Sequence, residues 1–167
     1  MPGLLDPHDR RVAPTRSAAG RAAVDASLTP SRKQPQWPAE LLELQRVLDD
    51  AGPAVGVRQV CSVQAGSQRF PIQAITLGNP CTDVPAVGFF GGVHGLERIG
   101  SRVVTAYLHS LLARLKWDGM LHRQLESLRL VFMPVVNPGG LLLGTRANPN
   151  GVDLMRNAPV DSEHKVP

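Results

Sequence analysis

The 167-residue chain has little of what marks several large classes of protein. Cys61 and Cys81 are its only cysteines, too few for a disulfide framework, so we expect free thiols, buried or half-buried. No segment reaches the roughly 20 apolar residues that a helix needs to span a bilayer. The start of the chain has no apolar stretch of the kind found in secretory signals. We therefore expect no membrane association and, by default, a cytoplasmic protein.

Net positive charge is small in the part of the chain that should fold. The formal net charge is +4, and residues 1–36 carry six basic and three acidic side chains, leaving a net +1 for the rest. A nucleic-acid-binding face needs clustered Lys and Arg on the domain itself, so we expect no such partner. Residues 1–36 are rich in Ala, Arg, Pro and Ser, which predicts a disordered basic tail. Residues 37–167 are then the folded part.

The hydrophobic pattern of the folded part predicts an α/β domain. We expect helices at 38–48, 99–115 and 120–125, a β-hairpin formed by 55–63 and 68–77, and strands at 86–90 and 128–136. One apolar face of the long helix should pack on the sheet, formed by Ile99, Val103, Val104, Leu108, Leu111, Leu112 and Leu115. The order β, β, β, α, β predicts a mixed, mainly parallel sheet with flanking helices.

A histidine and a glutamate stand three residues apart, where the strand at 86–90 gives way to the long helix. His94 and Glu97 supply an imidazole nitrogen and a carboxylate oxygen, two of the ligand types that Zn²⁺ prefers. At this spacing both side chains can face one site. A pair of this kind is also common as a surface hydrogen bond, so its context has to decide between the two interpretations.

A second set of polar residues follows the strand at 128–136. Asn137-Pro138-Gly139-Gly140 forms a turn signal at its end, and Arg146 and the segment Asp153-Leu154-Met155-Arg156-Asn157 come next. In open α/β sheets, sites form beyond the carboxyl ends of the strands. Two functional segments at two such ends favour one shared site.

The ordered motifs resemble the zinc carboxypeptidase family, which has a His-x-x-Glu pair, an Asn-Pro-x-Gly turn, an arginine and an Asp-x-Asn-Arg-Asn-like segment. The resemblance implies one Zn²⁺ bound by His94 and Glu97. It implies that Arg146 steadies the oxyanion of the tetrahedral intermediate and that Arg156 binds the free carboxylate of the substrate. The expected reaction is hydrolysis of an amide bond next to that carboxylate.

The sequence departs from the family at three points. Met155 stands where the family usually has an asparagine that helps to bind the carboxylate. The family's third zinc ligand is a histidine well downstream, and the only later histidine here is His164, with no strand or turn to deliver it. No residue matches the general-base glutamate. We therefore expect the N-terminal part of a catalytic domain, truncated at Pro167, without the third ligand and inactive as it stands.

Two other functions remain open. A zinc amidohydrolase of the succinylglutamate desuccinylase or aspartoacylase type shares the zinc pair and takes N-acyl amino acids instead of peptides, and Met155 keeps this alternative open. The chain can also be a non-catalytic fragment or binding module. The oligomeric state is not predicted. His109 and His122 have no partner at ligand spacing and are expected at the surface.

Truncation has an expected physical consequence for the fold. Without further strands, the sheet should have an open apolar edge beside Phe132 and Val135, and part of the 99–115 helix should lack its cover. Open edges recruit other chains. We therefore expect residues 1–167 alone to aggregate or to be partly molten.

Overall fold

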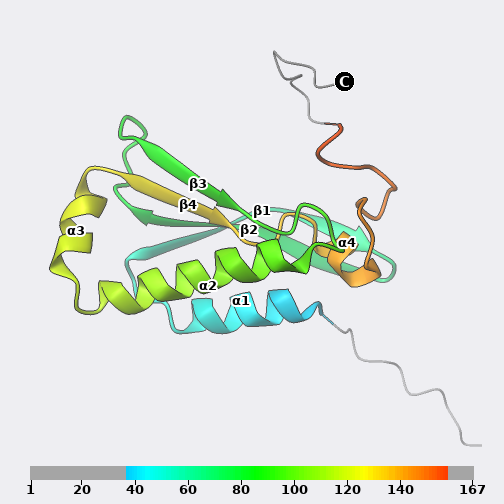
Figure 1. The fold of residues 1–167 in the computed structure, drawn as a ribbon, viewed down its shortest axis with the longest axis horizontal. Coiled ribbons are helices and arrows are strands. Elements are labelled where there is room, and N and C mark those ends of the chain that lie inside the picture. Colours follow the sequence, from blue (N-terminus) through cyan, green and yellow to red (C-terminus); the bar gives the residue numbers. More distant parts are fainter. Residues whose placement is uncertain (1–36, 158–167) are drawn as a thin grey trace, which may run out of the picture. The chain divides into compact units, whose positions relative to one another are not determined.

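The computed structural model describes residues 37–157, so the expected tail at 1–36, His164 and the expected truncation at Pro167 lie outside the described residues. Figure 1 shows the elements in chain order. They are α1 (Ala39–Asp49), β1 (Val55–Ala65), β2 (Gln68–Gly78), β3 (Ala86–Phe90), α2 (Arg98–Leu115), α3 (Gly119–Glu126), β4 (Arg129–Met133) and α4 (Pro138–Leu143). Every helix and strand expected from the sequence is present, and α4 is one that the periodicity did not indicate.

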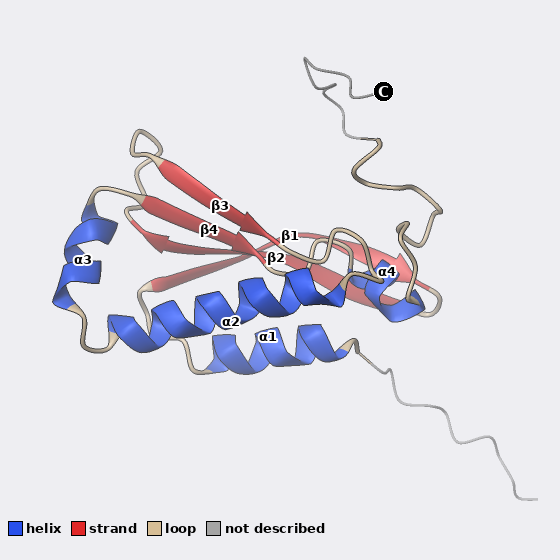
Figure 2. Ribbon diagram, viewed as in Figure 1, coloured by secondary structure: helices blue, strands red, loops and turns tan. Residues whose placement is uncertain are grey.

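The four strands form one mixed sheet in the order β1-β2-β4-β3. β1 and β2 are joined through Gly66 and Ser67 as the predicted hairpin, and Gly66 has φ 60°, which a glycine adopts at low cost. β2 pairs with β4 antiparallel, and β3 pairs with β4 parallel (Figure 2). The α/β class with flanking helices is confirmed. Within the described residues, however, two of three pairings are antiparallel, because only the crossover through α2 and α3 returns the chain in a parallel direction.

The core lies between the sheet and the two long helices. α2 packs on α1 and on β3 and β4. The buried residues of the main cluster are Leu44, Ile75, Leu77, Leu108, Leu111, Leu112, Leu121, Leu125, Leu130 and Phe132. A smaller cluster sits where α4 meets the hairpin, made of Leu41, Ala65, Phe70, Val135 and Leu141. This second cluster includes Val135 and Leu141 from the segment that follows β4.

The apolar residues of α2 occupy two faces, which corrects the single face expected from the sequence. Leu108, Leu111 and Leu112 are buried as predicted. Ile99 and Val103 are 71% and 57% exposed, and together with Tyr107 they form a strip with a spacing of four residues. Apolar periodicity identifies the apolar residues of a helix but not which of them contact the sheet. The pattern therefore predicts one apolar face where the helix has two adjacent strips.

The open apolar edge lies at β3 and not at β4. β4 is paired on both sides, and Phe132 and Val135 are buried, so the edge expected beside them is wrong. β3 is the outer strand because the crossover inserts β4 between it and β2. Its Val87 and Phe90 are 47% and 59% exposed. The sheet therefore exposes apolar side chains on β3, which contacts α2, and also on the other outer strand, β1, where Val57 and Val60 are 47% and 46% exposed.

Cys61 and Cys81 are free, as expected, but both are exposed and not buried. Cys61 lies on β1, an outer strand of the sheet, and Cys81 lies in the loop before β3, so neither reaches the core. Among residues 37–157, the structure contains no helix with the length and hydropathy that crossing a membrane would require.

Candidate metal and substrate site

His94 and Glu97 lie in the turn between β3 and α2. The Glu97 N–H donates to the His94 carbonyl oxygen at 3.1 Å, which closes the turn, and Glu97 is the residue immediately before the first turn of α2. The pair therefore stands where a strand gives way to a helix, as the sequence indicated, but in a turn and not along the helix itself. His94 is buried, at 7% exposure, whereas the Glu97 side chain is 52% exposed.

Asn137 holds this turn against the segments that follow β4. Its buried Nδ2 donates to the carbonyl oxygens of Val93, at 3.1 Å, and Ala147, at 3.2 Å. Its Oδ1 accepts the N–H of Gly140 at 2.8 Å and so caps α4. One amide side chain thus links the loop after β3, the helix α4 and the loop that carries Arg146. The sequence marked Asn137 as part of a turn, but not as the residue that joins the two halves of the site.

Close backbone contact at Gly95 brings α4 against the His94–Glu97 turn. A Cβ at Gly95 would overlap the backbone of Gly140 and the nitrogen of Leu141. Only glycine allows this approach, which explains why a glycine follows His94. The Asn-Pro-Gly-Gly turn and the His-x-x-Glu turn are therefore one packed unit.

The His94 ring lies between two carboxylates. Its Nδ1 is 3.1 Å from Glu97 Oε1, and its Nε2 is 3.3 Å from Asp153 Oδ1. Where Nε2–H donates to Asp153, Nδ1 carries the lone pair of the neutral ring and faces a negatively charged oxygen. A carboxylate on the second ring nitrogen is the usual support of a metal-bound histidine.

The pair fits two of the ligands of a zinc ion. Zinc–ligand bonds of about 2.0–2.1 Å at a tetrahedral angle place two ligand atoms about 3.3 Å apart, close to the 3.1 Å between His94 Nδ1 and Glu97 Oε1. A catalytic zinc takes three protein ligands. Residues 37–157 contain no group of three or more His, Cys, Asp or Glu side chains that could hold a metal ion. The described residues therefore offer two ligand-type side chains and no third beside them.

Arg146 joins the same cluster from the loop after α4. Its Nε donates to Asp153 Oδ2 at 2.8 Å, and its Nη1 lies 3.5 Å from Glu97 Oε1. The bond to Asp153 is the main cause of the raised pKa of Arg146. The same bond, with the backbone N–H of Arg156, the His94 ring and the N–H of Met155, lowers the pKa of Asp153 far below its usual range. Asp153 therefore stays charged and keeps Arg146 beside the His–Glu pair.

Arg156 lies at the outer side of the cluster. Its Nε is 3.7 Å from Asp153 Oδ2, beyond hydrogen-bonding distance, and its side chain is 80% exposed. Arg146, and not Arg156, is therefore the principal side-chain partner of Asp153. Met155 is also exposed, at 62%. Of the predicted residues, His94, Glu97 and Arg146 are brought together, while Arg156 faces solvent next to them.

Asp153 is the residue that the sequence left without a role. It stands 59 positions after His94, and one of its oxygens faces the His94 ring while the other binds Arg146. The only signal in the sequence was that Asp153 begins the segment that carries Arg156. The spacing of the residues did not indicate that His94 and Arg146 are its partners.

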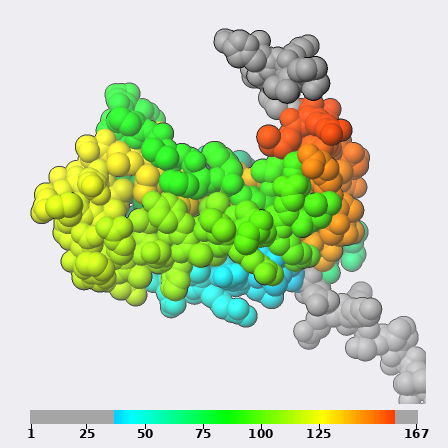
Figure 3. Space-filling view, viewed as in Figure 1, coloured from blue at the N-terminus to red at the C-terminus, as the bar shows by residue number. Residues whose placement is uncertain are grey.

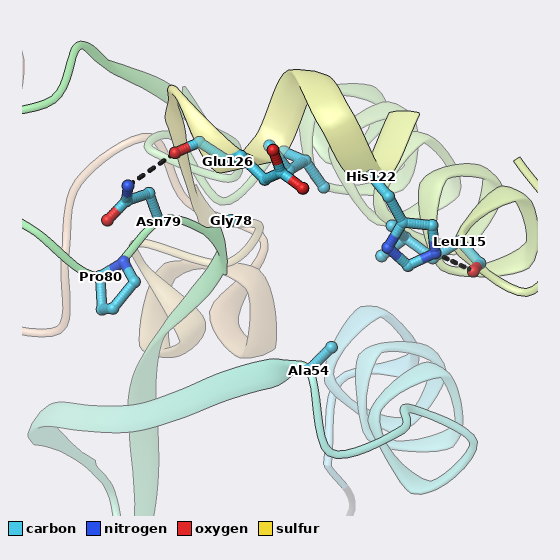
Figure 4. A pocket seen from close by; sticks show the side chains of 8 residues that line it. Ala54, Gly78, Asn79, Pro80, Leu115, His122 and Glu126 are labelled. Atoms are coloured by element: carbon cyan, nitrogen blue, oxygen red, sulfur yellow. Dashed lines mark hydrogen bonds between the residues drawn. The ribbon is translucent and has the colours of Figure 1, made fainter. Parts of the chain in front are cut away.

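A separate cleft of about 460 Å³ lies at the other end of the sheet, near Gly78, which pairs with the first residue of β4. Figure 4 shows that the His122 ring is bound to the Leu115 carbonyl oxygen, at 2.7 Å, and that Asn79 donates to the Glu126 carbonyl oxygen, at 2.6 Å. None of the predicted site residues lines this cleft. His122 and His109 are both exposed, as expected.

Ligand-type side chains and arginines gather beyond the carboxyl ends of the parallel strands β3 and β4, where sites form in open α/β sheets. The family model of the zinc carboxypeptidases matches residues 61–165, well over half of the chain, and the chain belongs to this family. Zinc is the metal that this family implies.

Individual proteins are similar to this chain in sequence or in fold. Carboxypeptidase SOL1 from Arabidopsis thaliana is 27% identical over 106 residues, which are 62% of this chain and 22% of the relative. A metallo-carboxypeptidase from Burkholderia cenocepacia has a similar fold, with a TM-score of 0.55 at 24% identity over 73% of this chain and 32% of the other. A proposed carboxypeptidase A from Shewanella denitrificans has a TM-score of 0.59 at 19% identity, over 73% of this chain and 31% of the other. The chain thus spans about a third or less of the length of each.

Proposed function

We propose that this chain carries part of the active site of a zinc-dependent hydrolase that cleaves an amide bond next to a free carboxylate. His94 and Glu97 hold one zinc ion, and the third protein ligand comes from outside the described residues. The observation that carries the proposal is the His94 ring, whose Nδ1 faces Glu97 while its Nε2 faces Asp153. A ring held in this way presents a metal-binding lone pair beside a second ligand.

The roles of the residues follow from their charges and positions. Zinc, when bound, supplies a Lewis acid and lowers the pKa of a bound water. Asp153 fixes the tautomer and orientation of the His94 ring. Arg146 places a permanent positive charge next to Glu97, where an oxyanion that forms beside the metal pair is stabilised. Arg156 offers an exposed guanidinium that can bind a carboxylate through two parallel hydrogen bonds.

Zinc binding by the 167-residue chain tests the assignment of the ligands. We expect His94→Ala and Glu97→Ala each to weaken zinc binding by at least tenfold, since outer-shell changes alone cost about 10–100-fold. His109→Ala is the matched control, because that histidine is exposed on α2, away from the site. Zinc affinity that stays the same in both site variants would remove the basis of the proposal.

A zinc amidohydrolase for N-acyl amino acids is the second candidate, and Met155 keeps it open. A thioether donates no hydrogen bond, so the carboxylate of a peptide would lose one partner next to Arg156. Binding of short peptides and of N-acyl amino acids, followed through the side-chain N–H signals of Arg156, separates the two. Stronger binding of peptides, unchanged or improved in Met155→Asn, supports the carboxypeptidase; a preference for acyl amino acids supports the alternative.

The third candidate is a binding module that keeps the fold without turnover. We expect residues 1–167 alone to show no measurable hydrolysis, because the described residues offer no third ligand beside the pair. Hydrolysis that zinc restores and a chelator abolishes would contradict this expectation. It would require a further ligand such as His164 or one from another subunit.

A further inference from the structure

Next to the site lies a buried carboxylate that the proposed chemistry does not use. Glu40, in the first turn of α1, is 1% exposed. Its Oε2 accepts a hydrogen bond from Arg98 Nη1 at 2.8 Å. Arg102 Nη2 lies 3.3 Å from its Oε1, but Oε1 has no hydrogen-bond partner, so this contact is charge attraction without alignment. Arg98 is therefore the principal partner of Glu40.

Arg98 connects three helices at one point. It is the first residue of α2 and follows Glu97 directly. While its Nη1 binds Glu40 on α1, its Nη2 donates to the carbonyl oxygen of Leu141 on α4 at 2.8 Å. Leu141 adjoins Gly140, the residue that packs against Gly95 inside the His94–Glu97 turn. The Arg98 guanidinium thus connects the end of the turn, at Glu97, to α4, the helix that packs against Gly95 in the middle of the turn.

The chemistry of the contact favours a positioning role over a purely stabilising one. Burying a carboxylate is costly, and a buried ion pair often contributes no more stability than apolar residues of similar size. A planar guanidinium instead fixes direction, because its two nitrogens bind two acceptors at once. Here the two acceptors belong to α1 and to α4, the helix that packs against the turn.

We propose that Glu40 and Arg98 are positioning residues that hold the His94–Glu97 turn in its metal-binding geometry. This inference rests on the proposed zinc function of the pair. Glu40 acts through Arg98 and supplies neither a ligand nor a reacting group. Its loss should therefore loosen the turn and weaken the metal site even where the fold persists.

Two variants of the 167-residue chain test this role. Arg98→Lys keeps the charge, but a single ammonium cannot bridge Glu40 and Leu141 with the same geometry. Glu40→Gln keeps the shape and removes the charge. The matched control is Asp118→Asn, which removes the ion pair with Arg114 near the other end of α2, whereas asparagine can still cap α3.

Two measurements are made on each variant after circular dichroism has shown that it is folded. One is zinc affinity, from competition with a chromophoric chelator. The other is hydrogen exchange of the Glu97 amide, whose N–H closes the turn. We expect Arg98→Lys and Glu40→Gln each to weaken zinc binding by about tenfold and to speed this exchange, while Asp118→Asn leaves both at the wild-type value.

The outcomes separate this inference from the proposed function. If His94→Ala lowers zinc affinity but both positioning variants match Asp118→Asn in affinity and exchange, the inference is overturned and the zinc site stands. If His94→Ala has no effect on zinc, the proposed function fails, and exchange of the Glu97 amide alone then decides whether Glu40 and Arg98 hold the turn. A variant that does not fold leaves the decision to the other one.

Discussion

Asp153 organises the cluster at the scale of single residues. One oxygen faces the His94 ring and the other binds Arg146, while the backbone N–H groups of Met155 and Arg156 donate to the first. A carboxylate with this many partners orients the histidine ring and the arginine together. Neither orientation could be assigned from the two residues alone.

The lowered pKa of Asp153 predicts how stability depends on pH. Its pKa in the folded state lies below its ordinary value of 3.8, mainly because of Arg146. The folded state therefore binds a proton less readily than the unfolded chain, and the contribution of Asp153 is present above about pH 4 and is lost as the pH falls through the folded pKa. We expect the melting temperature of Asp153→Asn to fall less than that of the wild type between pH 5 and pH 3.

Thermal unfolding of the two proteins across this range checks the prediction. Asp83→Asn serves as the control, because Asp83 is exposed in the loop before β3 and away from the cluster. Asp118 also has a lowered pKa and remains in every protein, so some acid sensitivity persists in all three. Curves of equal slope for wild type and Asp153→Asn would contradict the assignment.

At the scale of elements, the site depends on how tightly the turn after β3 packs on α4. Asn137 joins the two through side-chain bonds, and Gly95 lets their backbones touch. The short helix α4 therefore packs against the His94–Glu97 turn and supports it from one side. Arg98 supports the same turn at its end.

Gly95→Ala should separate these two elements. The added methyl group would overlap the backbone of Gly140, and overpacking of this kind costs about 1–3 kcal/mol. We expect a loss of that size in the free energy of unfolding, together with weaker zinc binding. Gly119→Ala is the control, since a Cβ there meets nothing within 4 Å. Denaturant unfolding and zinc titration measure both effects; a Gly95→Ala protein that matches the control would show that α4 does not support the turn.

At the scale of the whole molecule, exposed apolar side chains lie on β3 and on the neighbouring helix α2. β3 is an outer strand and exposes Val87 and Phe90, and α2 exposes Ile99 and Val103. Phe89 and Tyr107 connect the two elements, with their rings 5.1 Å apart. Figure 3 shows the chain around β3 and α2, in green, on one face of the molecule. Surfaces of this kind mark places where other protein segments pack.

Self-association of the 167-residue chain follows from this surface. We expect a broad thermal transition whose midpoint changes with protein concentration, because an unpaired apolar edge recruits further chains. Phe90→Lys combined with Val103→Glu should reduce the association. Trp117→Ser is the control, since Trp117 is 75% exposed but lies beyond the end of α2. A sharp transition of the wild type that is independent of concentration would refute the prediction.

The sequence was most informative about local structure and about chemical types. The hairpin around Gly66, the amphipathic helix before Leu115 and the turn at Asn137 follow from periodicity and turn residues close together in the chain. The ordered motifs indicated the family, and the family model confirms it. The roles assigned to His94, Glu97, Arg146 and Arg156 remain predictions, but three of these four side chains do lie together.

Only the tertiary structure decided what depends on long-range pairing. It placed β4 between β2 and β3, left Ile99 and Val103 exposed, and moved the open edge away from Phe132. It also joined Asp153 to His94 and Glu40 to Arg98 across more than 50 residues of sequence. A periodic pattern shows which residues within a short segment are apolar and share a face. Strand order and ion pairs between distant residues depend instead on how the whole chain packs.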